Sequence, residues 1–545
     1  GTTNTNAVDY VSWTFRKQAG FFDVVKFTAG TNTDRQIAHS LSCVPGMIIV
    51  KDLDAGYMNW QIYHKSLGQS KIIYLNLTQA ASTGNPWWGT TAHSSSNFSI
   101  NESYLVNGND HIAYLFADGD SSDAQIFGED GDEAIIKTGT YTGTGNTSLS
   151  VNLGFEPQWL LIKASSGGNA SGNYWAIYDV MRGWGNVSGS TKYLAPNTNS
   201  AEATWWDLQP TSTGFASTAD SGTRANESGT TYIYMAIRRG PMKEPSAGTD
   251  VLGLDASHPS SYENPFFQGN NVVDHAFWRT STGGTNYSVS RLLQGKFLQA
   301  QSNAALGSTS QAVFDYMNGF YDIGSGSASG YYAAMFTRYP KVFDVVVYAG
   351  NGSPSNNERN SLSHNLKVAP EMIIFKSSDS STEWQVGATP VSKGGYLNLT
   401  NSFPTSFTPG NEFTATTFDV SGWVSEANNN VSGNSYLCLL FSSLSGISAV
   451  NKYTGTGNDL NVTDLGAAAR WVMIKRTDAT GDWYVFDTLR GIVDGNDDYF
   501  LMNTTGADVT NTDYIDPHSS GFTITSSAPA GLNASGGTYL YLAFS

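Results

Sequence analysis

The last seven residues of the chain, "YLYLAFS" (539–545), repeat a phrase that occurs throughout the sequence. Most copies are rich in aromatic and branched apolar residues and all lack proline and glycine, a composition that favours β-strands. The other copies are "YVSWTFR" (10–16), "HIAYLFA" (111–117), "YIYMAIR" (232–238), "YYAAMFT" (331–337) and "YLCLLFS" (436–442). Successive copies start roughly 100 residues apart, and such a fixed period indicates a tandem architecture. We expect this strand to close each repeated unit.

Other phrases keep a constant order between the copies. A unit starts with an apolar run such as "FFDVVKFTAG" (21–30) and continues with a proline- or tryptophan-led strand such as "PGMIIVK" (45–51). A tryptophan strand such as "DWYVFD" (482–487) follows, and then a long loop rich in Ser, Thr, Asn and Gly. This order gives about seven short strands in roughly 100 residues, as in an antiparallel β-sandwich. No apolar period of 3.6 residues is sustained, so we expect few helices.

The sequence therefore predicts an all-β fold of tandem antiparallel β-sandwich units, of the jelly-roll or lectin-like kind, with little helix. We expect each unit to bury its apolar and tryptophan strands in a core of its own, because repeats of this size can fold as domains.

The units are of three kinds, which we call A, B and C. "FFDVV" (21–25) matches "VFDVV" (342–346), and "TYTGTGN" (140–146) matches "KYTGTGN" (452–458). The opening "WTFRKQAG" continues into "FFDVV" as "AMFTRYPK" continues into "VFDVV", so we expect the opening strand to close a C unit that precedes it. The predicted divisions are 1–19 (closing strand of a preceding unit), 20–120 (unit A1), 121–134 (acidic linker), 135–240 (unit B1), 241–340 (divergent unit C), 341–447 (unit A2) and 448–545 (unit B2).

Composition narrows the classes of function. Charged residues make up only 14% of the chain and aromatic residues 13%, a profile of loop-rich extracellular β proteins. The formal net charge of −17 argues against nucleic acid or an anionic membrane as partner, since both require basic patches. The chain contains no apolar run of 18 residues, so no membrane span is predicted.

Several phrases are similar to the tandem domains of large virion structural proteins of marine bacteriophages, cyanophages among them. They include "PGMIIVK" (45–51), "LGFEPQWLLIK" (153–163) and "GDWYVFDTLRGIV" (481–493). The resemblance covers nearly the whole chain and is weakest in unit C. It implies a tail-fibre-like or lectin-like protein at the virion surface, in contact with other virion proteins. It implies no catalytic residues and no cofactor.

Tryptophans in the long loops are the candidates for carbohydrate contact. Trp87 and Trp88 lie in "NPWWGTT", and Trp205 and Trp206 lie in "TWWDLQP". Flat, amphipathic rings on loops suit the faces of sugars. The alternative is that one tryptophan of each pair fills the edge of its sandwich.

A charged pair recurs in both B units. Asp179 and Arg182 lie in "DVMRG", and Asp487 and Arg490 lie in "DTLRG". Such a pair could grip a sugar, or it could be a salt-bridged turn in which the glycine adopts a positive φ. Its repetition favours the structural turn.

The acidic linker region could hold Ca²⁺ through its clustered oxygens. The weak metal candidates are Asp118, Asp120, Asp123, Asp130 and Asp132. The strict spacing of an EF-hand is absent, which favours a solvated linker over a calcium site. No other metal, cofactor or catalytic residue is predicted.

These observations lead to a non-enzymatic virion protein, a tail fibre or similar surface appendage that contacts host glycan and forms a homo-oligomer. The alternatives are a glycan-degrading tailspike or secreted glycanase, and a capsid decoration protein or secreted adhesin. A tailspike usually has a long parallel β-helix with short repeats, and the period of roughly 100 residues argues against it.

Overall fold

The closing phrase of each of the five units lies inside a large antiparallel sheet. It stands between the unit's first strand and the strand of the "PGMIIVK" kind, and the tryptophan strand or its counterpart follows. The computed structural model describes residues 10–83, 86–167, 174–185, 191–204, 208–217, 225–256, 265–293, 295–308, 312–321, 330–350, 361–406, 413–420 and 430–545. The predicted all-β fold is confirmed, and each helix in these ranges spans only three or four residues.

The large sheet of unit A1 has the spatial order β1 (Phe22–Thr28), β8 (Asp110–Ala117), β3 (Pro45–Asp52), β4 (Gln61–His64), β5 (Lys71–Tyr74) and β6 (Ser82–Thr83). Its small sheet pairs β2 (Arg35–Ala38) with β7 (Asn97–Ile100). The single-turn helix η1 (Glu102–Tyr104) lies between β7 and β8, and η2 (Ser122–Ala124) lies in the acidic linker.

The large sheet of unit B1 has the order β9 (Ile136–Thr142), β17 (Thr231–Arg238), β11 (Pro157–Ser166) and β12 (Ala176–Asp179), which the turn η3 (Val180–Arg182) follows. Its smaller sheets are β10 (Ser150–Asn152) with β16 (Gly214–Ser217) and β15 (Leu208–Thr211), and β13 (Lys192–Tyr193) with β14 (Ala203–Thr204).

The large sheet of unit C has the order β18 (Leu252–Asp255), β25 (Tyr331–Phe336), β20 (His275–Thr280), β21 (Tyr287–Ser290), β22 (Lys296–Gln299) and β23 (Gly307–Ser308). Its other elements are α1 (Gly248–Val251), η4 (Arg291–Leu293) and the pair of β19 (Phe267–Gln268) with β24 (Gly319–Phe320).

The large sheet of unit A2 has the order β26 (Phe343–Ala349), β33 (Ser435–Phe441), β28 (Met372–Ser377), β29 (Gln385–Ala388), β30 (Lys393–Tyr396) and β31 (Thr405–Ser406), with β27 (Ser361–Ser363) and β32 (Thr417–Asp419) as a separate pair. The large sheet of unit B2 has the order β34 (Ser448–Thr454), β42 (Thr538–Phe544), β36 (Trp471–Arg476), β37 (Trp483–Asp487), β38 (Asp497–Leu501) and β39 (Val509–Thr512). The small sheet of B2 contains β35 (Leu460–Val462), β41 (Gly521–Ile524) and β40 (Ile515–His518), and α2 (Ala530–Asn533) precedes the closing strand.

The central strands of the large sheets are buried on both faces. In β36, Val472 and Ile474 belong to an apolar cluster inside unit B2, between its two sheets. Trp471 and Met473 belong to a second cluster that unit B2 shares with units C and A2. Side chains alternate between the faces of a strand, so burial on both faces explains the uninterrupted apolar run "WVMI" (471–474). The prediction that each unit buries these strands in its own core is therefore wrong for one of the two faces.

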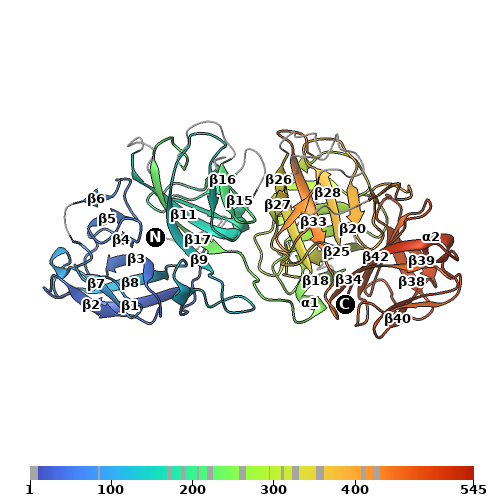
Figure 1. Ribbon diagram of the computed structural model, residues 1–545, viewed down its shortest axis with the longest axis horizontal. Helices are drawn as coiled ribbons and strands as arrows, with labels where there is room; N and C mark the ends of the chain where they lie inside the picture. Colours follow the sequence, from blue (N-terminus) through green and yellow to red (C-terminus); the bar gives the residue numbers. More distant parts are fainter. Residues whose placement is uncertain are drawn as a thin grey trace.

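Units C, A2 and B2 surround this shared cluster, and we call them the second group (Figure 1). Phe336 of unit C lies at its centre, with its ring centroid 5.4 Å from that of Phe343 in A2 and 5.8 Å from that of Trp471 in B2. Each of these three side chains is at most 1% exposed. Three sandwiches therefore depend on one common core.

Hydrogen bonds close a ring around the second group. An equivalent side chain in each unit donates to the carbonyl oxygen of the same strand position in the next unit: Trp384 to Gln299 (2.9 Å), Trp483 to Tyr396 (2.9 Å) and Asn286 to Leu501 (3.2 Å). The strand registers establish the equivalence, because each donor directly precedes a residue that pairs with one of these acceptors. The second group thus has approximate threefold symmetry.

Units A1 and B1 form the first group, and they pair as A2 and B2 do. Trp175 of B1 donates from Nε1 to the carbonyl oxygen of Tyr74 in A1 at 2.8 Å, the counterpart of the bond from Trp483. The apolar cluster of the first group draws on these two units, the segment between them, and Trp13 and Phe15. In Figure 1 the first group (blue to teal) lies beside the second group (green to red).

The opening segment does not form the predicted strand. Residues 10–17 belong to no sheet, and only Gln18 makes an isolated antiparallel bridge, with Phe22. A strand needs hydrogen-bonded neighbours, and these residues contact the first group through side chains instead. The ring of Phe15 lies 5.5 Å from that of Phe116 and 6.0 Å from that of Trp159.

Candidate functional site

Trp88, one of the candidates for carbohydrate contact, is a core residue. It is 1% exposed, and its Nε1 donates to the carbonyl oxygen of Lys71 at 3.2 Å. Its ring packs edge-on against Tyr63, with 5.7 Å between centroids. The buried ring cannot be offered to a sugar, so this candidate is corrected to the alternative role of filling the sandwich edge.

Trp87 keeps part of its ring at the surface. It is half-buried, and its ring centroid lies 4.1 Å from that of Tyr104. This pair of rings forms a small aromatic surface beside η1. Trp205 and Trp206 lie outside the described residues.

Both repeated Asp–Arg pairs form ion pairs directly after the tryptophan strand of a B unit. The distance from arginine Nε to aspartate Oδ2 is 2.6 Å in Asp179–Arg182 and 2.6 Å in Asp487–Arg490. Each aspartate also accepts a hydrogen bond from the backbone N–H of its arginine, at 3.0 and 3.1 Å. The two contacts close a turn, which is the structural role that repetition favoured.

The same pairs hold an aromatic side chain from a neighbouring segment. The guanidinium carbon of Arg490 lies 4.1 Å from the ring centroid of Tyr332 in unit C. In the first group the guanidinium carbon of Arg182 lies 5.4 Å from the ring of Trp13, whose Nε1 donates to Asp179 at 3.1 Å. Such cation–π contacts are stronger when desolvated. Each Asp–Arg pair thus lies at an interface inside its own group. Asp487–Arg490 faces unit C, and Asp179–Arg182 faces the opening segment.

The acidic region is anchored by lysine. Lys65 Nζ lies 2.5 Å from a carboxylate oxygen of Asp118 and 2.6 Å from one of Asp120. The other three candidate carboxylates are exposed: Asp123, Asp130 and Asp132. Across the described ranges, no three His, Cys, Asp or Glu side chains gather in a way that could hold a metal ion.

A groove of about 640 Å³ lies between the acidic region and residues 240–243. Glu129, Asp130 and Lys243 line it together with apolar Ile126 and Met242. The groove thus combines an apolar wall with two carboxylates and one ammonium group.

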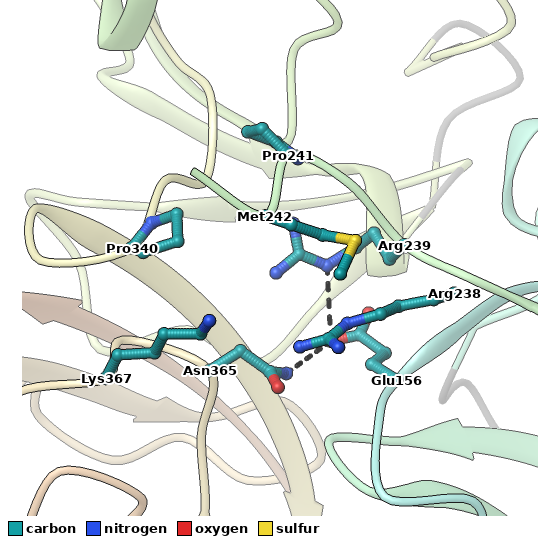
Figure 2. A pocket seen from close by; sticks show the side chains of 8 residues that line it. All are labelled: Glu156, Arg238, Arg239, Pro241, Met242, Pro340, Asn365 and Lys367. Atoms are coloured by element: carbon teal, nitrogen blue, oxygen red, sulfur yellow. Dashed lines mark hydrogen bonds and ion pairs between the residues drawn. The ribbon is translucent and has the colours of Figure 1, made fainter. Parts of the chain in front are cut away.

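Buried charges join the first group to the second (Figure 2). Arg338, between β25 and β26, lies 2.9 Å from Glu156 of unit B1 and 3.2 Å from Asp274 of unit C. Arg239 lies 3.4 Å from Glu156, and Asn365 of unit A2 donates to the same carboxylate at 3.3 Å. Figure 2 shows Arg239 and Asn365 converging on Glu156. The cavity beside them, about 10 Å³, has room for about one water molecule.

The pKa values of the network show how the charges compensate one another. Burial alone would lower the pKa of Arg338, but Glu156 and other carboxylates raise it above the ordinary arginine value. Burial alone would raise the pKa of Asp274, but the surrounding arginines hold it below its ordinary value. Repeat analysis could not find this network, because its five residues lie in five separate segments that only the fold brings together.

A histidine at the A1–B1 interface predicts acid sensitivity of the first group. His64 is 1% exposed, with Nε2 3.0 Å from the carbonyl oxygen of Tyr234. Burial lowers the pKa of His64 to about 4, whereas an unfolded histidine titrates near pH 6.5. The contribution of His64 to the stability of the first group is therefore complete above pH 6.5 and is lost as the pH falls toward 4. At pH 5 about 2 kcal/mol of stability is lost.

Hydrogen exchange of β4 and β17, measured at pH 7 and pH 5, tests this prediction. His64→Ala copies Ala388 at the equivalent position of A2. It should reduce the difference in stability between pH 7 and pH 5 by about 2 kcal/mol. A pH dependence identical in the variant and the parent would contradict the assignment to His64.

The fold and its interfaces define a class of all-β proteins in which sandwich units pack in groups around shared cores. Within the described residues, no helix is long and apolar enough to cross a membrane. Residues 1–241 and 334–545 match the family described as "Domain of unknown function (DUF7483)", and the chain belongs to this family. Comparisons with curated proteins and with solved structures gave no match. The matched segments contain the A and B units, and most of unit C lies between them.

Proposed function

We propose that this chain is a non-enzymatic structural protein of a bacteriophage virion, a tail fibre or similar surface appendage that contacts host glycan. The observation that carries the proposal is the common core of units C, A2 and B2. Units that share a core form a stiff module, and further modules extend an appendage without a new core design. Loops outside such a module can diversify while the scaffold stays constant. The phrases that resemble phage virion proteins support the same conclusion.

The proposed appendage acts as a homo-oligomer. Single sugar contacts are weak, and several chains that present them together gain affinity through effective concentration. The net charge of −17 keeps such particles dispersed.

Labelling of intact phage tests the placement. Gold-conjugated antibodies against the full chain should mark a tail or surface appendage, and particles treated with pre-immune antibodies should stay unmarked. Absence of label from every external structure would contradict the proposal. Incubation of the chain with host surface polysaccharide tests the enzymatic alternative, since released reducing ends would show a glycanase.

We expect the Trp87 side chain to contact glycan, so that its removal weakens binding. A single ring contact contributes about 0.5–1.5 kcal/mol, so Trp87→Ala should weaken binding of the full chain to host cells roughly two- to tenfold. Because the ring is half-buried on a loop, its removal should destabilise unit A1 by no more than about 1 kcal/mol.

Trp88→Ala is the matched control from the same loop. Removing this buried ring should destabilise unit A1 by about 3–5 kcal/mol. Trp87→Ala should therefore weaken binding to host cells with little loss of stability, whereas Trp88→Ala should show a large loss of stability. A Trp87→Ala chain that binds as well as the parent would show that this aromatic surface is not the contact.

A further inference from the structure

Unit A1 has a partly exposed sheet face whose counterpart in A2 is covered by unit C. The large sheets of A1 and A2 have the same strand registers, so each position in one has a counterpart in the other. At four positions the A1 side chain is half-buried and its A2 counterpart at most 1% exposed: Val24 (Val345), Trp60 (Trp384), Ile112 (Leu437) and Tyr114 (Leu439). We call these four A1 residues the open face.

The opening segment already occupies part of the place that the closing strand β25 takes in the second group. Three ring contacts of Phe15 reproduce those of Phe336: Phe22, Phe116 and Trp159 at 5.6, 5.5 and 6.0 Å, against Phe343, Phe441 and Trp471 at 5.4, 6.2 and 5.8 Å. Phe15 is half-buried, whereas Phe336 is 1% exposed. The opening segment thus places Phe15 on the first group as unit C places Phe336 on the second, with the ring of Phe15 still partly uncovered.

Unit B1 also keeps the charge that receives unit C in the second group. Arg279 of unit C lies 3.3 Å from Asp508 of B2, which in turn lies 3.5 Å from Arg490. The counterpart in B1 is Glu202, 3.1 Å from Arg182, with its side chain 31% exposed. A basic residue at the position of Arg279 would find a carboxylate in the first group too.

We propose that the open face and Glu202 form a docking surface for a further sandwich unit of the C kind. The occupant is defined by unit C itself. It carries a basic residue at the position of Arg279, donates a hydrogen bond from the position of Asn286 to B1, and accepts one from Trp60 Nε1 as Gln299 accepts from Trp384. Residues 10–16 then become its closing strand, because they gain the ladder partners that β25 finds in β18 and β20. The first group thereby acquires the approximate threefold symmetry of the second.

An extended chain tests this docking. A second copy of residues 241–333 is inserted between Ser12 and Trp13 of the complete chain. The added unit then continues into Trp13 as unit C continues into Ala334. The probe is maleimide labelling of Ile112→Cys, which is selective because Cys43 and Cys438 are buried. Leu437→Cys, at the covered counterpart position, sets the rate of a protected site.

In the parent chain, Ile112→Cys should react about tenfold or more faster than Leu437→Cys, since the covered site reacts only when the interface opens. In the extended chain its rate should fall to that of Leu437→Cys. Arg279→Glu together with Asn286→Ala, placed only in the added unit, should restore fast labelling. Exposed Ser122→Cys should react equally in both chains.

Two results would overturn the docking proposal. One is an added unit that resists protease while Ile112→Cys still reacts at its parent rate. The other is an added unit that protease removes while residues 13–545 stay intact, because unit C is folded against the counterpart face in the parent chain. Hydrogen exchange of β3 and β8 provides a second measurement, and it should slow in the extended chain.

Discussion

Changing Trp384 to alanine is expected to destabilise the second group by about 3–5 kcal/mol, the usual cost of removing a buried aromatic side chain. Trp384 is fully buried in the cluster shared by three units, so its removal leaves a cavity between them. The change also removes the hydrogen bond from the indole to the carbonyl oxygen of Gln299, which adds to the cost. The effect should therefore spread to unit C.

The matched control is Trp60→Ala, at the equivalent position of unit A1. Trp60 is half-buried, and its ring stacks on Tyr114 at 6.4 Å. We expect this change to cost about 1 kcal/mol, because the site is open to water and leaves little cavity.

Hydrogen exchange is the suitable measurement for both variants, because a chain of several units does not unfold in one step. In Trp384→Ala, amides of β28, β33 and β20 should lose protection together, while those of β3 and β8 keep theirs. Equal losses at the two positions, or a loss confined to unit A2, would contradict the role of the shared core.

Repetition made the strands and their order predictable. The run "WVMIK" identifies a strand, because its composition and length suit a buried strand and its position recurs. The run does not show which neighbour covers each face. Trp471 and Val472 are adjacent and equally apolar, yet one contacts another unit and the other its own small sheet. Packing between units depends on long-range geometry that a strand phrase does not encode.

The candidate residues show the same limit. Trp87 and Trp88 are indistinguishable in "NPWWGTT", and only the direction of the loop buries one ring and leaves the other partly exposed. Asn286 stands where the A and B units have tryptophan, so no motif indicates that its amide closes the ring of the second group. Its role follows from register alone.

The charged junction has no sequence signal of its own. Arg338 has a basic counterpart in Lys17, which lies 2.6 Å from Asp23 with its side chain 57% exposed. Only the fold brings Glu156 to Arg338, from a position 182 residues away. Equivalent residues thus have a surface role in one group and a buried role in the other.

Arg338→Met should consequently destabilise the junction by about 3–5 kcal/mol, because it leaves buried carboxylates without their main partner. The Arg338 side chain is 1% exposed, and those of Glu156 and Asp274 are each 7% exposed. Lys17→Met is the control, and we expect it to cost no more than about 1 kcal/mol, since its ammonium group is largely solvated. Protection of β11, β20 and β26 against hydrogen exchange measures the loss at the junction, and protection of β1, which contains Asp23, measures the loss in the control.

Acid distinguishes lost charge compensation from lost packing in this variant. In the parent chain the arginines hold the pKa of Asp274 below its ordinary value, so its contribution is complete above about pH 4 and is lost as the pH falls further. In Arg338→Met the compensating positive charge is gone, so the buried carboxylates take up protons at a higher pH. Protonation removes the cost of their uncompensated negative charge. The gap between parent and variant should be widest at pH 7 and should narrow as the pH approaches 4. A gap of constant size over this range would mean that Arg338 acts by filling space, and the junction would then tolerate any side chain of similar volume.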